Sequence, residues 1–314
     1  MQPVHHKAIP QRAINYIHCI NMKQPLLLAI CLVLACPAFC QLADLARVEY
    51  TIVPGGSGNV EFNRKRALIN IPIKIKEDNY LVLGLDYSSI DLVFSNQFEE
   101  FNQDEIEDFQ MVDFNIAYTF KINDDWRFAG RVLPGISSNL KTSDLQFKDA
   151  VISADAIFIK DKKNDSGVKK PYRLILGVSY SGNRGLPFPL PFISYYKRFH
   201  PKWSYNLGVP ITNLQYRWSE LVRTKLFASL DGFNSNLQRR LEVNDQGVAE
   251  QIRMSLILGG LRNEINFSKH LELFVITTYI LNNVVQLRDA NHDTLFEIDN
   301  INTFHFRAGL RFKI

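Results

Sequence analysis

The last residues of the chain alternate strictly between apolar and polar side chains. One parity holds Phe304, Phe306, Ala308, Leu310, Phe312 and Ile314, and the other holds His305, Arg307, Gly309, Arg311 and Lys313. Because successive side chains of a β-strand point to opposite faces, this pattern predicts a strand with one apolar face. Residues 67–75, 113–120 and 203–209 alternate in the same way. Beyond residue 40, neither a long helical periodicity nor an apolar run of membrane-helix length competes with this pattern.

The alternating segments predict a closed sheet of about 14 strands, or 12 if the pair around Ser219-Glu220 does not form. The predicted ranges are 46–53, 60–76, 80–90, 109–121, 126–137, 148–160, 171–181, 190–199, 203–209, 212–218, 221–231, 249–267, 271–282 and 301–314. In hydrocarbon every backbone group must be paired, and a closed sheet has no edge. The predicted fold class is therefore all-β, a single antiparallel transmembrane β-barrel with both termini on one side.

The predicted connections alternate in length. Short polar turns are expected at 77–79, 123–125, 200–202 and 268–270, and long polar connections at 91–108, 138–147, 182–189, 232–248 and 283–300. Aromatic residues flank the short turns, for example Tyr118 and Phe120 before one turn and Trp126 after it. Outer-membrane barrels combine short periplasmic turns, long extracellular loops and aromatic girdles at both interfaces. A soluble sheet with aromatic residues beside its turns is the alternative.

The first forty residues carry a targeting signal. Met22-Lys23 precedes the apolar run 26–35, and Ala38-Phe39-Cys40 stands before Gln41 as a small-x-small cleavage site, which is typical of a secretory signal peptide. We expect residues 1–21 to be an upstream extension, 22–40 the signal peptide and 41–314 the barrel domain. An internal Met22 is one alternative, and acylation at Cys36 instead of cleavage before Gln41 is another.

Charge and cysteine content point the same way. Lys7, Arg12 and Lys23, with no acid among residues 1–40, account for most of the net charge of +4. All four cysteines also lie in this segment, so a thiolate metal site is not expected in the barrel domain. With 46% hydrophobic and 22% charged residues, the chain is not collagen-like or disordered.

The leader, the alternating strands and the aromatic terminal strand resemble those of Gram-negative outer-membrane β-barrels. Within these, Leu207-Gly208-Val209-Pro210, Tyr216-Arg217-Trp218 and the run 226–232 (LFASLDG) resemble an uncharacterised barrel family, a domain of unknown function. The resemblance implies location in the bacterial outer membrane, contact with its lipid, and contact with the barrel-insertion machinery through the C-terminal strand. It brings no catalytic residues.

Motifs for chemistry are weak. Residues 54–59 lie between two strands and are interpreted as a turn, not a phosphate loop. His200, His270, His292 and His305 include no pair at ligand spacing, so a metal site at His292 with Asp289 and Asp293 is weighed against a solvated loop, which is preferred. His305 shares the polar parity, which argues against a hydrolase on the lipid-facing rim. We therefore expect no enzyme, no metal, no cofactor and no nucleic-acid partner.

The strongest functional signal comes from the alternate strand positions that carry polar side chains. It predicts that charged side chains face the lumen, namely Lys74, Lys76, Asp86, Asp113, Arg127, Arg131, Asp155, Arg173, Arg217, Arg253, Arg307 and Arg311, together with Glu272. The excess of cations favours a narrow passive pore for small anionic solutes. The alternatives are a closed-lumen structural or surface-binding barrel that uses its long loops, and, less favoured, a lipid-processing barrel enzyme.

Overall fold

Fifteen strands form one sheet in the computed structural model, which describes residues 44–55, 60–94, 97–142, 144–163, 169–185, 188–298 and 302–313. The strands are β1 (Asp44–Val53), β2 (Val60–Lys76), β3 (Asn79–Phe94), β4 (Asp108–Lys121), β5 (Trp126–Ser138), β6 (Ala150–Lys162), β7 (Tyr172–Ser181), β8 (Leu190–Arg198), β9 (Trp203–Val209), β10 (Ile211–Arg217), β11 (Val222–Val243), β12 (Gly247–Asn266), β13 (Leu271–Arg288), β14 (Thr294–Ile298) and β15 (Phe304–Lys313). Three short 3-10 helices join them, η1 (Gln103–Ile106), η2 (Phe147–Asp149) and η3 (Asn244–Gln246).

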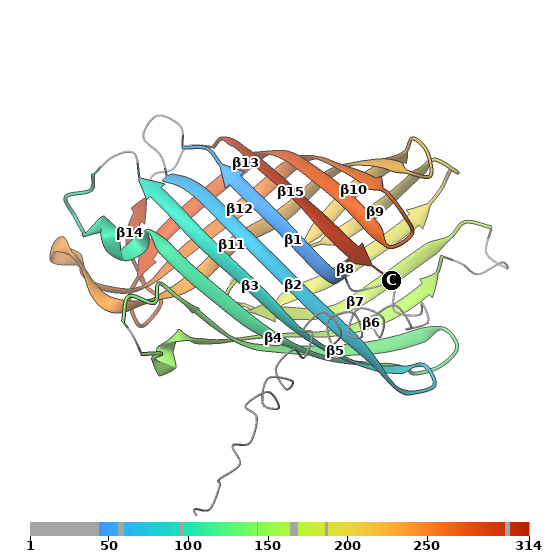
Figure 1. Ribbon diagram of the computed structural model, residues 1–314, viewed down its shortest axis with the longest axis horizontal. Coiled ribbons are helices and arrows are strands. Elements are labelled where there is room, and N and C mark those ends of the chain that lie inside the picture. Colours follow the sequence, from blue (N-terminus) through green and yellow to red (C-terminus); the bar gives the residue numbers. More distant parts are fainter. Residues whose placement is uncertain are drawn as a thin grey trace, which may run out of the picture. The chain divides into compact units, whose positions relative to one another are not determined.

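All strands except β14 form the wall of a closed antiparallel barrel (Figure 1). Neighbours in the chain pair from β1 to β13, and the sheet closes because β15 pairs with both β13 and β1. The wall therefore has fourteen strands, which confirms the predicted fold class and the larger of the two predicted strand numbers. The short β14 adds to β13 outside this ring of pairings.

Two of the predicted long loops are wrong. β11 continues to Val243 and β12 begins at Gly247, so most of 232–248 is a strand hairpin. β13 likewise continues to Arg288, and β14 lies within 283–300. On β11 the alternation disappears because residues 232–238 are all buried. A strand covered on both faces has no polar face for a period-2 pattern to reveal.

The outer surface of the barrel carries an apolar belt. On β2, the outward side chains Ile69, Ile71 and Ile73 are 39–50% exposed, whereas the outward positions further along the strand are Asn63 and Lys65. Exposed apolar side chains continue the belt on other strands: Leu83, Leu85, Phe114, Ile116, Val132, Phe158, Ile193, Leu207, Leu226, Leu261, Phe306 and Leu310. A belt of this kind is what a barrel presents to lipid hydrocarbon.

The two ends of the barrel differ. Asp44 pairs with Lys313, so the first and last described residues lie at the end that also has the turns 77–78, 122–125, 199–202, 218–221 and 267–270. We call this the turn end and the opposite one the loop end. There are exceptions, because the 163–171 connection at the turn end is long and the β9–β10 connection, which faces the loop end, is only Pro210. Aromatic rings gather at the turn end, where Trp203 and Tyr216 lie 4.7 Å apart by ring centroids.

Part of the loop end is filled by a packed apolar core, which we call the cap. Phe233 lies at its centre, with ring centroids 5.5 Å from Phe109 and 6.0 Å from Phe62. Its members come from β1–β4, β11–β14 and the 95–107 connection: Val53, Val60, Phe62, Ile90, Leu92, Phe101, Ile106, Phe109, Met111, Phe233, Leu237, Leu241, Val243, Ala249, Ile252, Met254, Leu256, Leu258, Ile280, Val285, Leu287 and Ile298. Among the described residues, β5 to β10 contribute none of it. The cap therefore occupies one part of the barrel cross-section.

In the half of β11 nearer the loop end, the strand separates from β10 and approaches β5. The Leu230 amide donates to the Pro210 carbonyl (3.3 Å), the Asn234 amide to the Asn183 carbonyl (3.0 Å), and Asn236 then forms a parallel bridge with Ser138. We call this line of contacts the seam. Gly232 makes it possible, since φ is +140° there and a Cβ would collide with the Met254 carbonyl oxygen. Above the β9–β10 hairpin, β11 is thus bonded to β5 instead of β10.

Asp149 of η2 holds the seam from the loop end. Its fully buried carboxylate accepts hydrogen bonds from Asn236 Nδ2 (2.5 Å), Gln238 Nε2 (2.7 Å) and the Gln146 amide (2.8 Å). Burial by itself raises the pKa of Asp149, but these hydrogen bonds outweigh burial and hold that pKa below its ordinary value. Asp149 is therefore ionised at neutral pH.

In the described ranges, no helix is both long and apolar enough to span a bilayer. The predicted leader, residues 1–40, lies outside the described residues.

Candidate functional site

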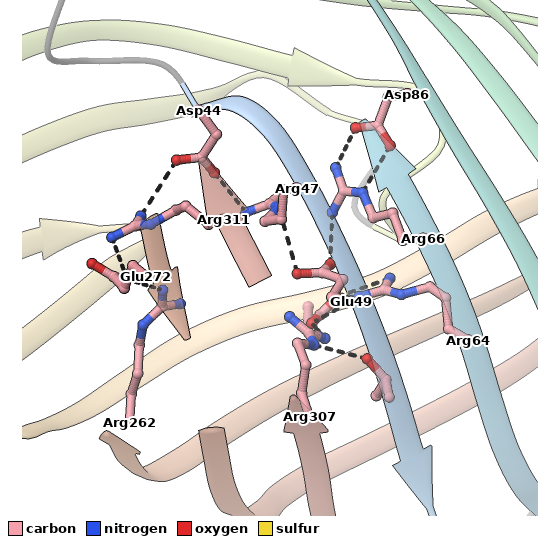
Figure 2. Close-up of polar contacts among 12 residues, drawn as sticks. Asp44, Arg47, Glu49, Arg64, Arg66, Asp86, Arg262, Glu272, Arg307 and Arg311 are labelled. Carbon is pink, nitrogen blue, oxygen red and sulfur yellow. Dashed lines mark hydrogen bonds and ion pairs between the residues drawn. The ribbon is translucent and has the colours of Figure 1, made fainter. Parts of the chain in front are cut away.

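Arginines from separate parts of the wall meet inside the barrel. Arg64 on β2 lies 3.4 Å from Asp231 on β11 (Nη1 to Oδ1), and Arg307 on β15 lies 2.5 Å from the same carboxylate (Nη2 to Oδ2). Since β11 pairs with neither β2 nor β15, both contacts cross the lumen. Figure 2 shows Arg64 and Arg307 near Glu49, which stands between them on β1.

A second carboxylate group extends this cluster. Arg66 binds Asp86 through two nitrogens, Nε to Oδ1 at 2.8 Å and Nη2 to Oδ2 at 2.5 Å, and its Nη1 lies 3.5 Å from Glu49 (Figure 2). Arg47 also approaches Glu49 at 3.5 Å. We call Arg47, Glu49, Arg64, Arg66, Asp86, Asp231 and Arg307 the central network. Its arginines outnumber its carboxylates.

A second network, joined to the central one through the Arg47–Asp44 pair, lies nearer the turn end around two fully buried carboxylates, Glu264 and Glu272. Glu264 is held by Lys225 and Arg262, both at 2.7 Å, and Glu272 by Arg311 at 2.6 Å. Arg223 and Lys313 complete it: Arg223 Nη2 lies 2.9 Å from Glu264 and 3.0 Å from Glu272, and Lys313 Nζ 2.7 Å from Glu272. Arg311 also reaches Asp44 at 3.5 Å, as Figure 2 shows. Five cations share these two buried acids, and desolvation is offset by multiple ion pairs.

Residues 182–185, which follow β7, fold into the lumen. Asn183 Nδ2 donates to Asp113 Oδ2 on β4 (2.7 Å), and the Gly185 carbonyl accepts from Ser255 Oγ on β12 (2.5 Å). Between these anchors stands Arg184, whose side chain is exposed to the space inside the barrel. Within the described part of the chain, no hydrogen bond or ion pair engages its guanidinium. Arg184 is thus a cation presented to the lumen.

Arg184 lines two sizeable cavities that share several lining residues. The larger, about 450 Å³, is lined by Asp44 and Arg311 at the turn end and by Arg66 and Arg131 deeper inside; we call it the chamber. The second, about 290 Å³, lies against the β9–β10 hairpin and β11; we call it the side cavity. Both are lined by Arg184, Arg47, Arg66 and Phe192, so these residues stand where the two cavities meet.

The structure divides the predicted lumen charges into three groups. Some lie near the turn end, where Arg127 donates to the Asp78 carbonyl (2.6 Å) and Arg217 pairs with Glu220 (3.7 Å): Lys74, Lys76, Arg127, Arg173 and Arg217. Others make contacts inside the lumen, and these include the Arg131–Asp155 pair: Asp86, Asp113, Arg131, Asp155, Arg307 and Arg311, with Glu272. Arg253 stands apart, donating to the Gly185 carbonyl.

Sequence reasoning missed much of both networks, namely Arg47, Glu49, Arg64, Arg66, Arg184, Arg223, Lys225, Asp231, Arg262 and Glu264. Parity could have found some of them, because Arg64 and Arg66 share the even parity of Lys74 and Lys76 on β2. Their outward neighbours Asn63 and Lys65 are polar, however, so the alternation becomes invisible there. No sequence signal marks Arg184, which lies in a connection that folds inward.

The histidines have ordinary partners. His305 is buried, its Nδ1 lies 3.0 Å from Thr278 Oγ1, and its Nε2 lies 3.3 Å from Arg307. His292 lies 2.9 Å from Gln251 Oε1. Among the described residues, no group of three or more His, Cys, Asp or Glu side chains is arranged to hold a metal ion.

Comparison with known proteins gives a family and a set of similar barrels. The profile of a family described as "Domain of unknown function (DUF6268)" matches residues 55–314. No curated protein matches the chain. Similar solved structures include the NanC porin (9% identity, TM-score 0.36, 86% of this chain and 100% of that one). Others are the toluene transporter TodX of Pseudomonas putida (8%, 0.34, 89% and 92%) and the translocator domain of the autotransporter NalP from Neisseria meningitidis (10%, 0.35, 93% and 95%). These values carry no functional conclusion.

Proposed function

The chain belongs to the DUF6268 family, and on that premise we propose that it is an outer-membrane barrel that binds small anionic solutes in a lumen closed at the loop end. The apolar belt, the even number of wall strands and the common side of both described ends support this location. In this arrangement the turn end faces the periplasm and the belt contacts lipid. The terminal strand β15 is the segment available to the barrel-insertion machinery.

The cap favours the closed-lumen alternative over a pore along the axis. Phe109 and Phe233 are completely buried at its centre, and cap residues from opposite strands contact one another. Protein interiors packed in this way leave no space for a hydrated ion to pass. Beside the cap, the bonding of β11 to Asn183 and β5 along the seam narrows the remaining cross-section. Solutes would therefore enter and leave the chamber from the turn end.

The observation that carries the proposal is the position of Arg184. It lines both cavities and makes no hydrogen bond or ion pair in the described chain, although it interacts at longer range with Asp155 and Asp86, which already pair with Arg131 and Arg66. A cation that makes no direct ion pair in a confined space attracts anions more strongly than it would in bulk water. Planar guanidinium groups suit carboxylate and phosphate oxygens in particular.

A non-enzymatic role is part of the same proposal. The buried His305 contacts Thr278 and Arg307 and is 1% exposed, so it is not available to activate a nucleophile for an incoming substrate.

The proposal is tested on the full-length protein purified from membranes, by titration calorimetry with inorganic phosphate and sulfate. We expect saturable binding that weakens about tenfold in Arg184→Gln, since a charge-assisted contact contributes about 1.5–3 kcal/mol. The matched control is Arg217→Gln, which removes a guanidinium that already pairs with Glu220 near the turn end. Heat-modifiable gel migration verifies that each variant is folded.

Planar-bilayer recordings provide the second measurement. The closed cap predicts no steady conductance in potassium chloride. Stable anion-selective conductance would instead support the pore alternative, and a folded protein that binds neither phosphate nor sulfate would overturn the anion site.

A further inference from the structure

In one sector of the barrel wall the strands are too short to span the membrane. β9 (Trp203–Val209) and β10 (Ile211–Arg217) have seven residues each, whereas their neighbour β11 has 22. A membrane-spanning strand needs about 9–11 residues at the usual tilt. Because β9 begins and β10 ends at the turn end, the Pro210 tip of their hairpin lies within the thickness of the apolar belt.

Among the described residues, the sheet does not continue beyond this hairpin toward the loop end. Above Pro210, β11 is bonded first to the Asn183 carbonyl and then to β5, so it moves away from the low hairpin and not over it. The seam closes the barrel on the inner side of the hairpin. The Pro210 tip is therefore the upper edge of the wall in this sector, and we call it the rim. The side cavity lies directly inside this rim, since Pro210, Ile211 and Leu230 line it.

The rim end of the side cavity is apolar. Ile211 has the inward parity of Asn213 and Gln215, yet its side chain is 46% exposed, and Phe188 of the 182–189 connection is 49% exposed. Phe192 and Leu190 on β8 line the same end. Apolar side chains exposed on the inner side of a wall gain nothing from lipid contact, so they call for an apolar occupant.

The opposite end of the same cavity is cationic. Arg47, Arg64, Arg66, Arg184 and Arg307 line it, and Asp231 is the single carboxylate among its lining residues. Four of these arginines share the three carboxylates of the central network, and Arg184 makes no hydrogen bond or ion pair in the described chain. One cavity therefore places an apolar rim and a guanidinium cluster at its two ends.

We propose that the side cavity is a lateral portal between the chamber and the outer leaflet, and that it takes single-chain anionic amphiphiles. The carboxylate or phosphate head would bind at Arg184 and its neighbours, and the alkyl chain would lie against Phe188, Phe192 and Ile211 and pass over the Pro210 rim. A volume of about 290 Å³ lies at the lower limit of ligand pockets, which favours one alkyl chain over the two of a phospholipid. This inference rests on the proposed anion site and specifies its ligand.

The test uses photolabelling of the full-length protein in vesicles with a decanoate analogue that carries a diazirine near the end of its chain. We expect mass spectrometry to locate the label within 188–192 and 209–211. Decanoate and decyl phosphate should compete, and acetate and 1-decanol should not, because each of the latter offers only one of the two chemistries. The stronger of the two competitors identifies the head group as carboxylate or phosphate.

Two variants separate the head from the chain. Ile211→Ser should weaken decanoate binding about tenfold, by loss of apolar contact, and leave phosphate binding unchanged. Arg184→Gln should weaken both. The matched control is Leu207→Ser, which removes an exposed apolar side chain from the outer face of the same hairpin. Heat-modifiable migration verifies folding.

The outcomes are distinguishable. If phosphate binds but the label appears only on outward residues such as Ile193 and Leu207, the portal is wrong and the anion site stands. If neither phosphate nor decanoate binds to folded protein, the anion site fails as well. Equal competition by 1-decanol would show a merely hydrophobic cavity and overturn the assigned role of the arginines.

Discussion

Asp231 on β11 and Arg64 on β2 contact each other across the lumen, 3.4 Å apart, although their strands are not neighbours in the sheet. Arg307 on β15 binds the same carboxylate. One aspartate thus ties three separate parts of the wall together at mid-height. The Arg64 side chain is 7% exposed and that of Asp231 19%, so the contacts are shielded from solvent but not dry.

Removal of Asp231 should destabilise the barrel. Asp231→Asn leaves two guanidinium groups close together without their shared counter-ion, and breaking a buried pair costs about 3–5 kcal/mol, with the lower value expected for a partly exposed carboxylate. Urea titration followed by heat-modifiable migration measures the change. Asp245→Asn, in the exposed β11–β12 turn, is the control and should be neutral. An unchanged midpoint for Asp231→Asn would show that the central network does not contribute to stability.

The height of the apolar belt can be mapped on one strand. Ile71→Arg places a charge within the belt and should cost about 2–4 kcal/mol, whereas Asn63→Arg, outward on the same strand but nearer the loop end, should cost about 1 kcal/mol or less. The yield of folded protein in vesicles reports both. Equal impairment by the two substitutions would mean that the belt extends further along β2 than the exposed side chains indicate.

The cap should respond to loss of its central rings. Phe109→Ala and Phe233→Ala each remove a fully buried ring, for which about 3–5 kcal/mol is expected. Because the rings are in contact, the double variant should cost less than the combined effects of the single ones. Phe147→Ala is the control, since Phe147 is 98% exposed. Strict additivity would argue against their packing on each other.

The seam should loosen in acid. The pKa of Asp149 is lower in the folded protein than in the unfolded chain, so its contribution is complete above the ordinary aspartate value of about 3.9 and is lost as pH falls through the folded value. Hydrogen exchange of residues 139–142, 144–149 and 236–238 should therefore stay slow at neutral pH and accelerate below about pH 4. Asp149→Asn should exchange quickly at neutral pH as well. If exchange of the wild type were fastest at neutral pH after correction for intrinsic rates, the assignment would fail.

The alternation of side chains was sufficient to predict the wall because lipid imposes it. Ile69, Ile71 and Ile73 must be apolar where they contact hydrocarbon, and their inward neighbours need not be. Outside the belt this constraint ends, so Arg64 and Arg66 were missed beside the polar Asn63 and Lys65. The cap was missed for the opposite reason, since strands buried on both faces show no period. The pairing of Arg64 with Asp231 has no spacing rule at all, because it depends on the curvature that brings β2 and β11 face to face.

Because Asn236 on β11 is bridged to Ser138 on β5, the strands enclose a narrower tube near the loop end than near the turn end. Around the seam, the sheet closes through β5 and β11 directly, and the five strands β6–β10 form an alcove attached to that smaller tube. Changes in the number or length of these five strands would alter the alcove without disturbing the closed tube. An extra hairpin inserted between β8 and β9 should therefore enlarge the side cavity while the cap keeps its packing. Related barrels can in this way accept ligands of different size in the side cavity while the cap continues to block passage along the axis.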